Sequence, residues 1–138
     1  MLASPQRCVS ALLEAPMRTV LTRSYRIEAA HRLPKLPADH KCHRLHGHSF
    51  RVTLHVTGEL DNRLDWVVDY ASIDEAWRPL HDALDHRYLN EIPGLDNPTS
   101  EALARWIFER VKLVSGKLCA VSVAENCDSG CTVHGAGA

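Results

Sequence analysis

Apolar and polar residues alternate most regularly between His48 and Thr57. Side chains of a strand point in turn to its two faces, so the pattern predicts a half-buried antiparallel strand. A less regular alternation from Leu21 to His31 predicts an earlier strand with His31 at the end of its inner face. The apolar face of the more regular strand comprises Phe50, Val52, Leu54 and Val56.

A first helix is predicted after residues 66–69, which lead into it, with Leu84 in its apolar stripe and Asp85 and His86 at its end. Ser72 and Glu75 have the spacing of a capping box near its start. Pro79 lacks a backbone N–H and should kink or split the helix. The apolar stripe at steps of three and four residues comprises Ile73, Trp77, Leu80 and Leu84.

A second helix is predicted from Asn97 to about Gly116. Asn97 has the side chain of an N-cap, and Pro98 suits the first helical position. Gly116 is a C-terminal stop signal. The buried stripe would comprise Leu103, Ile107, Val111 and Val114.

Two strands are predicted to close the chain, the third strand over residues 119–125 and a short fourth strand over residues 131–134. The order strand, strand, helix, helix, strand, strand predicts an α+β fold, an antiparallel sheet with both helices on one face. The other face carries few large apolar residues and the sheet edges are open, which suits oligomerisation by edge pairing.

Bulk composition fits one globular domain. The chain has 138 residues, of which 45% are apolar and 24% charged. A net charge of −1 gives no electrostatic reason to expect nucleic acid or an anionic membrane as a partner. No apolar run reaches the roughly 20 residues that span a bilayer, and the N-terminal segment is a poor secretory signal. We therefore expect a cytoplasmic protein without a membrane partner.

The N-terminal residues 1–17 show neither periodicity nor a clear helix cap. We expect them to form a disordered or non-native extension, with Met17 as an alternative start. Residues 18–138 then form a single domain.

Cysteine usage indicates free thiols, because five cysteines are an odd number without the spacing of a disulfide framework. Cys127 and Cys131 bracket a turn and could pair under oxidation, although two unpaired thiols are the expectation in the cytosol. Of the nine histidines, four are predicted to lie on the surface: His40, His43, His55 and His81.

The sequence His46-Gly47-His48 places two imidazoles on one face of a strand. With His31 on the inner face of the preceding strand, they can form a three-nitrogen metal site with an open fourth position. Zinc suits three neutral imidazoles best, and an open position is typical of a catalytic zinc. The alternative is a set of hydrogen-bonded histidines near a turn.

Cys42 precedes this motif and is flanked by the cations Lys41 and Arg44. Positive surroundings stabilise a thiolate, so a general base or nucleophile is favoured over a buried filler or a fourth zinc ligand.

Two carboxylates add candidate chemistry. Asp85 adjoins His86 and could set its tautomer, although a histidine stabilised by a helix end is an equal alternative. Glu125 falls at an inward position of its strand, where a carboxylate needs a cation or a ligand with N–H donors as its partner. The alternative is that Glu125 lies past the end of the strand, in solvent.

Taken together, these residues resemble the 6-pyruvoyl-tetrahydropterin synthase superfamily, most closely its 6-carboxy-tetrahydropterin synthase branch in queuosine biosynthesis. The resemblance runs from about Tyr25 to Val133 and rests on residues 28–34 (EAAHRLP), 40–42 (HKC), 45–50 (LHGHSF), 84–90 (LDHRYLN) and 97–101 (NPTSE).

This resemblance implies the T-fold, in which subunits join strands into a barrel and active sites lie at the interfaces of a tetramer or hexamer. It implies a carbon–carbon lyase that converts 7,8-dihydroneopterin triphosphate to 6-carboxy-5,6,7,8-tetrahydropterin, acetaldehyde and triphosphate. The implied roles are zinc binding by His31, His46 and His48, proton acceptance by Cys42, acid–base catalysis by His86 with Asp85, pterin anchoring by Glu125, and pterin contacts by Thr99 and Ser100.

Two positions depart from the family pattern: Asn126 replaces the usual threonine after the anchoring glutamate, and Asp65 replaces a glycine. Neither removes an implied ligand or catalytic residue. Two alternatives remain, which are elimination of triphosphate to give 6-pyruvoyl-tetrahydropterin and a non-catalytic zinc-binding module.

Overall fold

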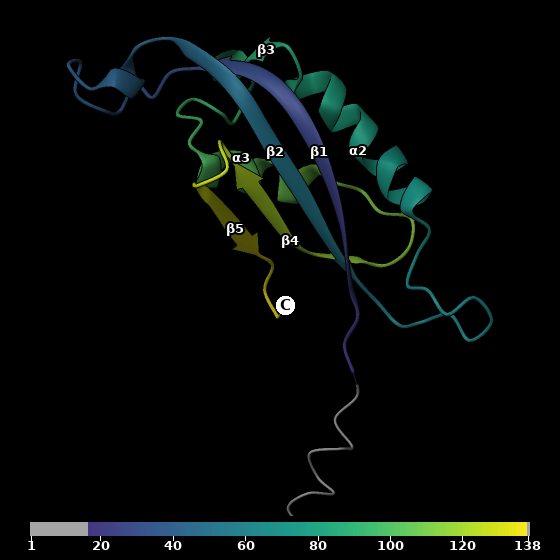
Figure 1. Cartoon of the computed structure of the whole chain (residues 1–138). Coiled ribbons are helices and arrows are strands. Elements are labelled where there is room, and N and C mark those ends of the chain that lie inside the picture. Colours follow the sequence, from purple (N-terminus) through teal and green to yellow (C-terminus); the bar gives the residue numbers. More distant parts are fainter. Residues whose placement is uncertain (1–16, 138) are drawn as a thin grey trace, which may run out of the picture.

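The computed structural model describes residues 17–137, which fold into one five-stranded sheet and two α-helices (Figure 1). In chain order the elements are β1 (Val20–His31), the 3-10 turn η1 (Lys41–His43), β2 (His46–Thr57), α2 (Tyr70–Leu84), β3 (Arg87–Tyr88), the 3-10 turn η2 (Leu89–Glu91), α3 (Ser100–Arg110), β4 (Lys117–Ala124) and β5 (Gly130–His134).

The sheet is open and has the strand order β3-β1-β2-β4-β5. β1 and β2 pair antiparallel along their whole length, from Val20 opposite Thr57 to His31 opposite His46. β3 pairs parallel with β1 at Ala29 and Ala30, so the sheet is mixed and the prediction of a purely antiparallel sheet was wrong. A two-residue strand carries no periodicity, and only its contact with β1 defines it.

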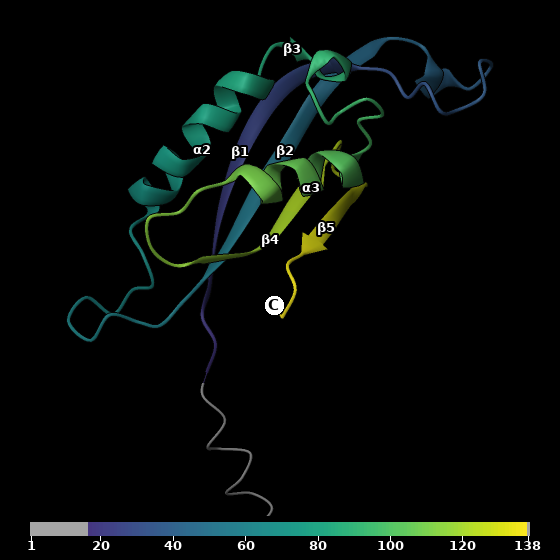
Figure 2. The same cartoon turned by 180° about the vertical axis from the view of Figure 1, so that it is seen from behind.

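Both helices cover the same face of the sheet, as predicted (Figures 1 and 2). The alternating apolar residues of β2 point to this face and are fully buried, together with residues of both helices. The opposite face carries the polar residues of the central strands, including Ser49, Arg51 and Thr53 of β2. The α+β class and the layer arrangement are therefore confirmed.

Helix α2 begins directly after Asp69 and is not split. Asp69 is its N-cap and accepts a hydrogen bond from the Ala71 N–H at 3.0 Å, so Ser72 lies inside the helix and the predicted capping box was wrong. Pro79 lies at an exposed position within one continuous helix. The carbonyl group that loses its helical partner there belongs to exposed Glu75, where water can replace the missing N–H.

Helix α3 is shorter than predicted at both ends. Thr99, not Asn97, is the N-cap, and its hydroxyl oxygen accepts the Ala102 N–H at 3.1 Å. The helix ends at Arg110, so Val111 is buried as the C-cap, whereas Val114 is 94% exposed and was wrongly assigned to the core. The apolar spacing continues past the helix end and gives no boundary.

No helix within residues 17–137 has the length and apolar character to cross a membrane. The predicted extension, residues 1–17, lies outside the described part except for the exposed Met17.

Four of the five cysteines lie in the described part and all are free thiols, including Cys127 and Cys131. His40 is exposed as predicted, but the other three histidines assigned to the surface are half-buried: His43, His55 and His81. Their rings have specific partners. His43 Nδ1 bonds to the Leu36 carbonyl at 2.9 Å, for example.

Candidate metal and pterin site

Three histidines cluster where β1 and β2 meet at one end of the sheet. His31 lies opposite His46 in the strand register, and His48 lies opposite Ala29. One nitrogen from each ring lies within 4.8 Å of the others. His31 is 1% exposed, and burial, the main cause, lowers its pKa, so its ring is held neutral. The predicted three-histidine cluster is therefore present.

Backbone carbonyl groups fix the orientation of all three rings. His31 Nδ1 lies 2.9 Å from the carbonyl oxygen of Pro98, His46 Nδ1 lies 2.8 Å from that of Arg44, and His48 Nδ1 lies 3.0 Å from that of Ser49. A carbonyl oxygen only accepts hydrogen bonds, so each Nδ1 carries the proton. Each neutral ring therefore keeps a lone pair on Nε2.

The Nε2 atoms of His31 and His48 lie 3.2 Å apart. Two neutral imidazoles that both carry the proton on Nδ1 would repel each other there through their lone pairs. Two nitrogens bound to one tetrahedral zinc at about 2.0–2.1 Å would lie about 3.3 Å apart. Donor type, tautomer and spacing therefore all fit a zinc ion bound by three Nε2 atoms, with carbonyl groups as outer partners.

Cys42 lies in η1, in the connection between β1 and β2, and is half-buried. The connection is tied back on itself, since the Leu33 N–H donates to the Cys42 carbonyl at 2.8 Å and the Cys42 N–H donates to His40 Nδ1 at 3.1 Å. Within the described residues, the cluster of metal-binding atoms includes the three histidines and not this thiol, so a fourth-ligand role for Cys42 is not supported.

Asp85 and His86 follow the end of α2 and are held against β1. The Glu28 N–H donates to Asp85 Oδ1 at 2.9 Å, and His86 Nδ1 donates to Asp85 Oδ2 at 2.8 Å. The Glu28 backbone bond, followed by the His86 bond, holds the pKa of the Asp85 carboxyl below its usual value. The His86 backbone has φ 56°, a left-handed conformation uncommon outside glycine, and its ring is mostly exposed.

An open cleft of about 470 Å³ lies between β1, β2 and β3 beside His86. His48 and His86 both line it. Sequence alone gave Asp85 and His86 two equal interpretations. The structure adds a fixed tautomer and an exposed ring in a cleft shared with His48.

Glu125 follows the last residue of β4 and is half-buried, not free in solvent. The Ser100 hydroxyl donates to its Oε1 at 2.9 Å. Thr99, adjacent to Ser100, uses its hydroxyl oxygen as the α3 cap. The structure thus brings Glu125 and Ser100 into contact and gives Thr99 a structural role.

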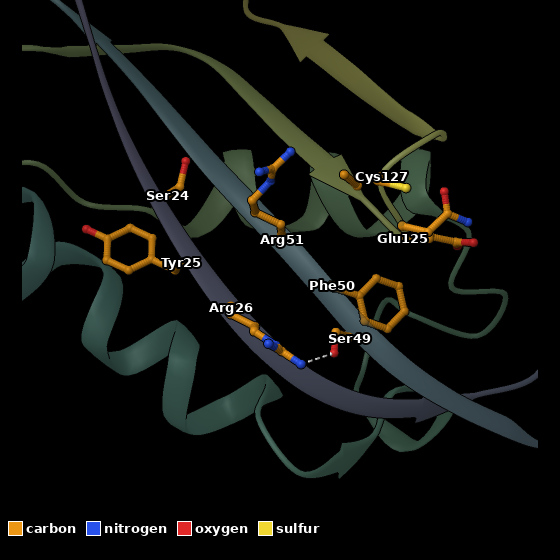
Figure 3. A pocket seen from close by; sticks show the side chains of 10 residues that line it. Ser24, Tyr25, Arg26, Ser49, Phe50, Arg51, Glu125 and Cys127 are labelled. Carbon is orange, nitrogen blue, oxygen red and sulfur yellow. Dashed lines mark hydrogen bonds between the residues drawn. The ribbon is translucent and has the colours of Figure 1, made fainter.

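A second cleft, of about 410 Å³, opens beside Glu125 (Figure 3). Phe50 of β2 lines it, as do Arg26 and Arg51, which lie opposite each other in the strand register. Arg26 is held by Ser49 and Glu28, at 2.7 Å from each. The ring of Phe50 is fully buried in the core, so the group that the cleft offers to a heterocycle with N–H groups is the Glu125 carboxylate.

The two departures from the family pattern have a local explanation. Asp65 has φ 55°, the conformation that favours the glycine it replaces. Asn126 lines the cleft beside Glu125, and its Oδ1 accepts the Asp128 N–H at 2.9 Å, which stabilises the turn into β5.

Within one chain, His48 of the histidine cluster shares one cleft with His86, and Glu125 lines the other. Glu125 nevertheless lies close enough to His31 for its charge to act on the pKa of that ring. Cys42 lines neither of these two clefts. Sequence reasoning missed the Pro98 carbonyl group that orients His31 and the Asn90 side chain that bonds to the residue after His31. Both contacts join segments more than 50 residues apart, so local patterns gave no signal for them.

Comparison with known proteins gives a consistent result. Residues 20–136 match the family model for 6-pyruvoyl tetrahydropterin synthase. The chain is 39% identical, over 117 residues, to a 6-carboxy-5,6,7,8-tetrahydropterin synthase of Synechocystis sp., an alignment that covers 80% of this chain and 88% of the relative. It is 40% identical, over 68 residues, to a dihydroneopterin monophosphate aldolase of Pyrococcus furiosus, covering 49% of this chain and 56% of that one.

Among solved structures, the chain resembles the 6-pyruvoyl tetrahydropterin synthase of Caenorhabditis elegans. The TM-score is 0.77 at 27% sequence identity, and the match covers 87% of this chain and 97% of the other. The fold predicted from the sequence is therefore confirmed.

Proposed function

The chain belongs to the 6-pyruvoyl tetrahydropterin synthase family, and we propose that it is a zinc-dependent lyase acting on 7,8-dihydroneopterin triphosphate. The products would be 6-carboxy-5,6,7,8-tetrahydropterin, acetaldehyde and triphosphate. One observation carries the proposal: a cluster of three histidines with free Nε2 atoms, in a chain 39% identical to a 6-carboxy-5,6,7,8-tetrahydropterin synthase.

The proposed zinc ligands are the Nε2 atoms of His31, His46 and His48. Zinc in such a site supplies Lewis-acid chemistry, which lowers the pKa of a bound substrate hydroxyl. The carbonyl partners at each Nδ1 keep the three rings in the binding orientation without rearrangement.

Cys42 is proposed as the base that removes a proton from the substrate side chain. Its place in a turn held by two backbone hydrogen bonds limits where the sulfur can move.

His86 is proposed to transfer protons while the side chain is cleaved. Its Nδ1 proton stays on the bond to Asp85, so Nε2 is the atom that accepts and returns a proton. Asp85 orients the ring and stabilises the charge that forms on it.

Glu125 is proposed to bind the amino-pyrimidine edge of the pterin through two N–H···O bonds. Ser100 would orient the carboxylate, and Thr99 would contact the ring through the donor that its hydroxyl still has.

We further propose a homo-oligomer, a tetramer or hexamer, with active sites between subunits. The open sheet edges would supply the contacts. A cytoplasmic role in queuosine biosynthesis is part of the same proposal.

Product analysis tests the activity. The zinc-loaded protein is incubated with 7,8-dihydroneopterin triphosphate, and acetaldehyde and the pterin product are measured. Acetaldehyde in equal amount to 6-carboxy-5,6,7,8-tetrahydropterin is expected. A pyruvoyl product without acetaldehyde would assign the chain to the sister activity, and zinc binding without turnover would support a binding module.

A further inference from the structure

The side-chain amide of Asn90, in η2 just after β3, forms hydrogen bonds with both the N–H and the carbonyl group of Arg32. The Arg32 N–H donates to Asn90 Oδ1 at 2.9 Å, and Asn90 Nδ2 donates to the Arg32 carbonyl at 2.8 Å. The same Nδ2 donates to the Asp96 carbonyl at 3.3 Å. One half-buried amide therefore joins the end of β1 to the segment that leads into α3.

Both of these segments determine the position of the His31 ring. Arg32 is the residue after His31, so the pair of bonds fixes the backbone from which the ring extends. Asp96 lies two residues before Pro98, whose carbonyl group accepts the His31 Nδ1 proton. Asn90 thus acts on the ligand's backbone and on the partner that orients its ring.

The same bonds fix the point where the Cys42 connection leaves the sheet. Leu33 follows Arg32 and donates its N–H to the Cys42 carbonyl at 2.8 Å. Loss of the bonds to Arg32 would free the first residue of this connection. The thiol would then lose the support that holds it relative to the histidine cluster.

We propose that Asn90 is a positioning residue for both the zinc ligand His31 and the loop that carries Cys42. The inference rests on the zinc site of the proposed function. It requires an amide, because the residue must accept a bond from an N–H and donate to two carbonyl groups at once. Aspartate keeps the acceptor but turns a negative charge toward both carbonyl oxygens.

The test compares Asn90→Ala and Asn90→Asp with the wild-type chain and with the control variant Asn62→Ala. Asn62 lies in the exposed connection between β2 and α2 and lines neither cleft. Three quantities are measured: the zinc dissociation constant by competition with a chelator, the visible spectrum of the cobalt(II) form, and the alkylation rate of Cys42 by peptide mass spectrometry.

Both Asn90 variants are expected to raise the zinc dissociation constant about 10- to 100-fold. They should also change the cobalt(II) spectrum and the alkylation rate of Cys42, whereas Asn62→Ala leaves all three unchanged. A folded Asn90→Ala protein with wild-type zinc affinity and spectrum would overturn the proposal. So would failure of both variants to fold, because Asn90 would then be a residue of general stability.

Failure of the proposed function gives a different result. If the wild-type chain binds no zinc, the metal site does not exist and the proposal for Asn90 fails with it. A wild-type chain that binds zinc but forms no product leaves the positioning role of Asn90 open to the same affinity and spectroscopic measurements.

Discussion

Replacement of Glu125 by glutamine tests its proposed role as the pterin anchor and keeps the hydrogen bond from Ser100. Ser100 donates to Oε1 of the carboxylate at 2.9 Å, and the glutamine carbonyl oxygen can accept the same bond. The change removes the charge and places an NH₂ group where the substrate would also present an N–H. Fold and zinc content should therefore be unaffected.

The expected size follows from the two bonds that the carboxylate would make to the pterin. A hydrogen bond to a charged group contributes about 1.5–3 kcal/mol. Glu125→Gln loses one such bond outright and leaves the other without charge, a loss of about 3 kcal/mol. That corresponds to a decrease in kcat/KM of about 150-fold. The bonds lie away from the reacting side chain, so most of the effect should be on KM.

Steady-state kinetics of acetaldehyde formation measure this effect. Ser100→Ala should weaken kcat/KM less than Glu125→Gln does, because the carboxylate keeps its charge. Glu59→Gln removes a charge from an exposed turn and serves as the control. A decrease of less than about fivefold in Glu125→Gln would refute the anchoring role, since neither charged bond would then be lost from the complex.

Three further results are expected. Removal of zinc by a chelator should lower the Tm, because a ligand at 100 times its dissociation constant stabilises the folded state by about 2.7 kcal/mol. An unchanged Tm would contradict a zinc site in the folded chain. Asp85→Asn should reduce kcat about 100-fold or more with zinc content unchanged, because the amide no longer fixes the His86 tautomer; kinetics with metal analysis measure both. Asp74 accepts bonds from Arg23 at 2.8 Å and from Tyr25 at 2.7 Å, the Arg23 bond being the main cause of its lowered pKa. Because the pKa of this carboxyl is lower in the folded state, it stabilises the fold at pH values above its unfolded pKa. Asp74→Asn should therefore lower the free energy of unfolding, measured by chemical denaturation, by about 1 kcal/mol at neutral pH. The loss should become smaller as the pH falls below 3.8.

Sequence patterns predicted the elements whose positions local chemistry determines. β2 could be predicted because its alternation matches a strand with one buried face. The boundaries of α3 could not, because a threonine outside the apolar pattern caps it and the apolar spacing continues past Arg110. β3 exists only through its pairing with β1, more than 50 residues away in the sequence.

The same distinction applies to the site. The histidine cluster could be predicted since His31, His46 and His48 lie at the paired ends of consecutive strands. The bond between Ser100 and Glu125 joins α3 to β4 and needs the tertiary fold to be seen. The two hydrogen bonds between Asn90 and Arg32 join segments 58 residues apart in the sequence, so no periodic pattern of residues indicates them.

The pairing of β1 with β2 also bears on the order in which parts of the chain can fold. All three histidines lie within 18 residues, from His31 to His48, whereas Glu125 reaches its place through contacts between distant segments. Short loops close with less loss of chain entropy and form early. A nascent chain can therefore bring its three clustered histidines together before the helices and later strands exist. Zinc captured at that stage would hold the hairpin closed and serve as a nucleus for the rest of the sheet.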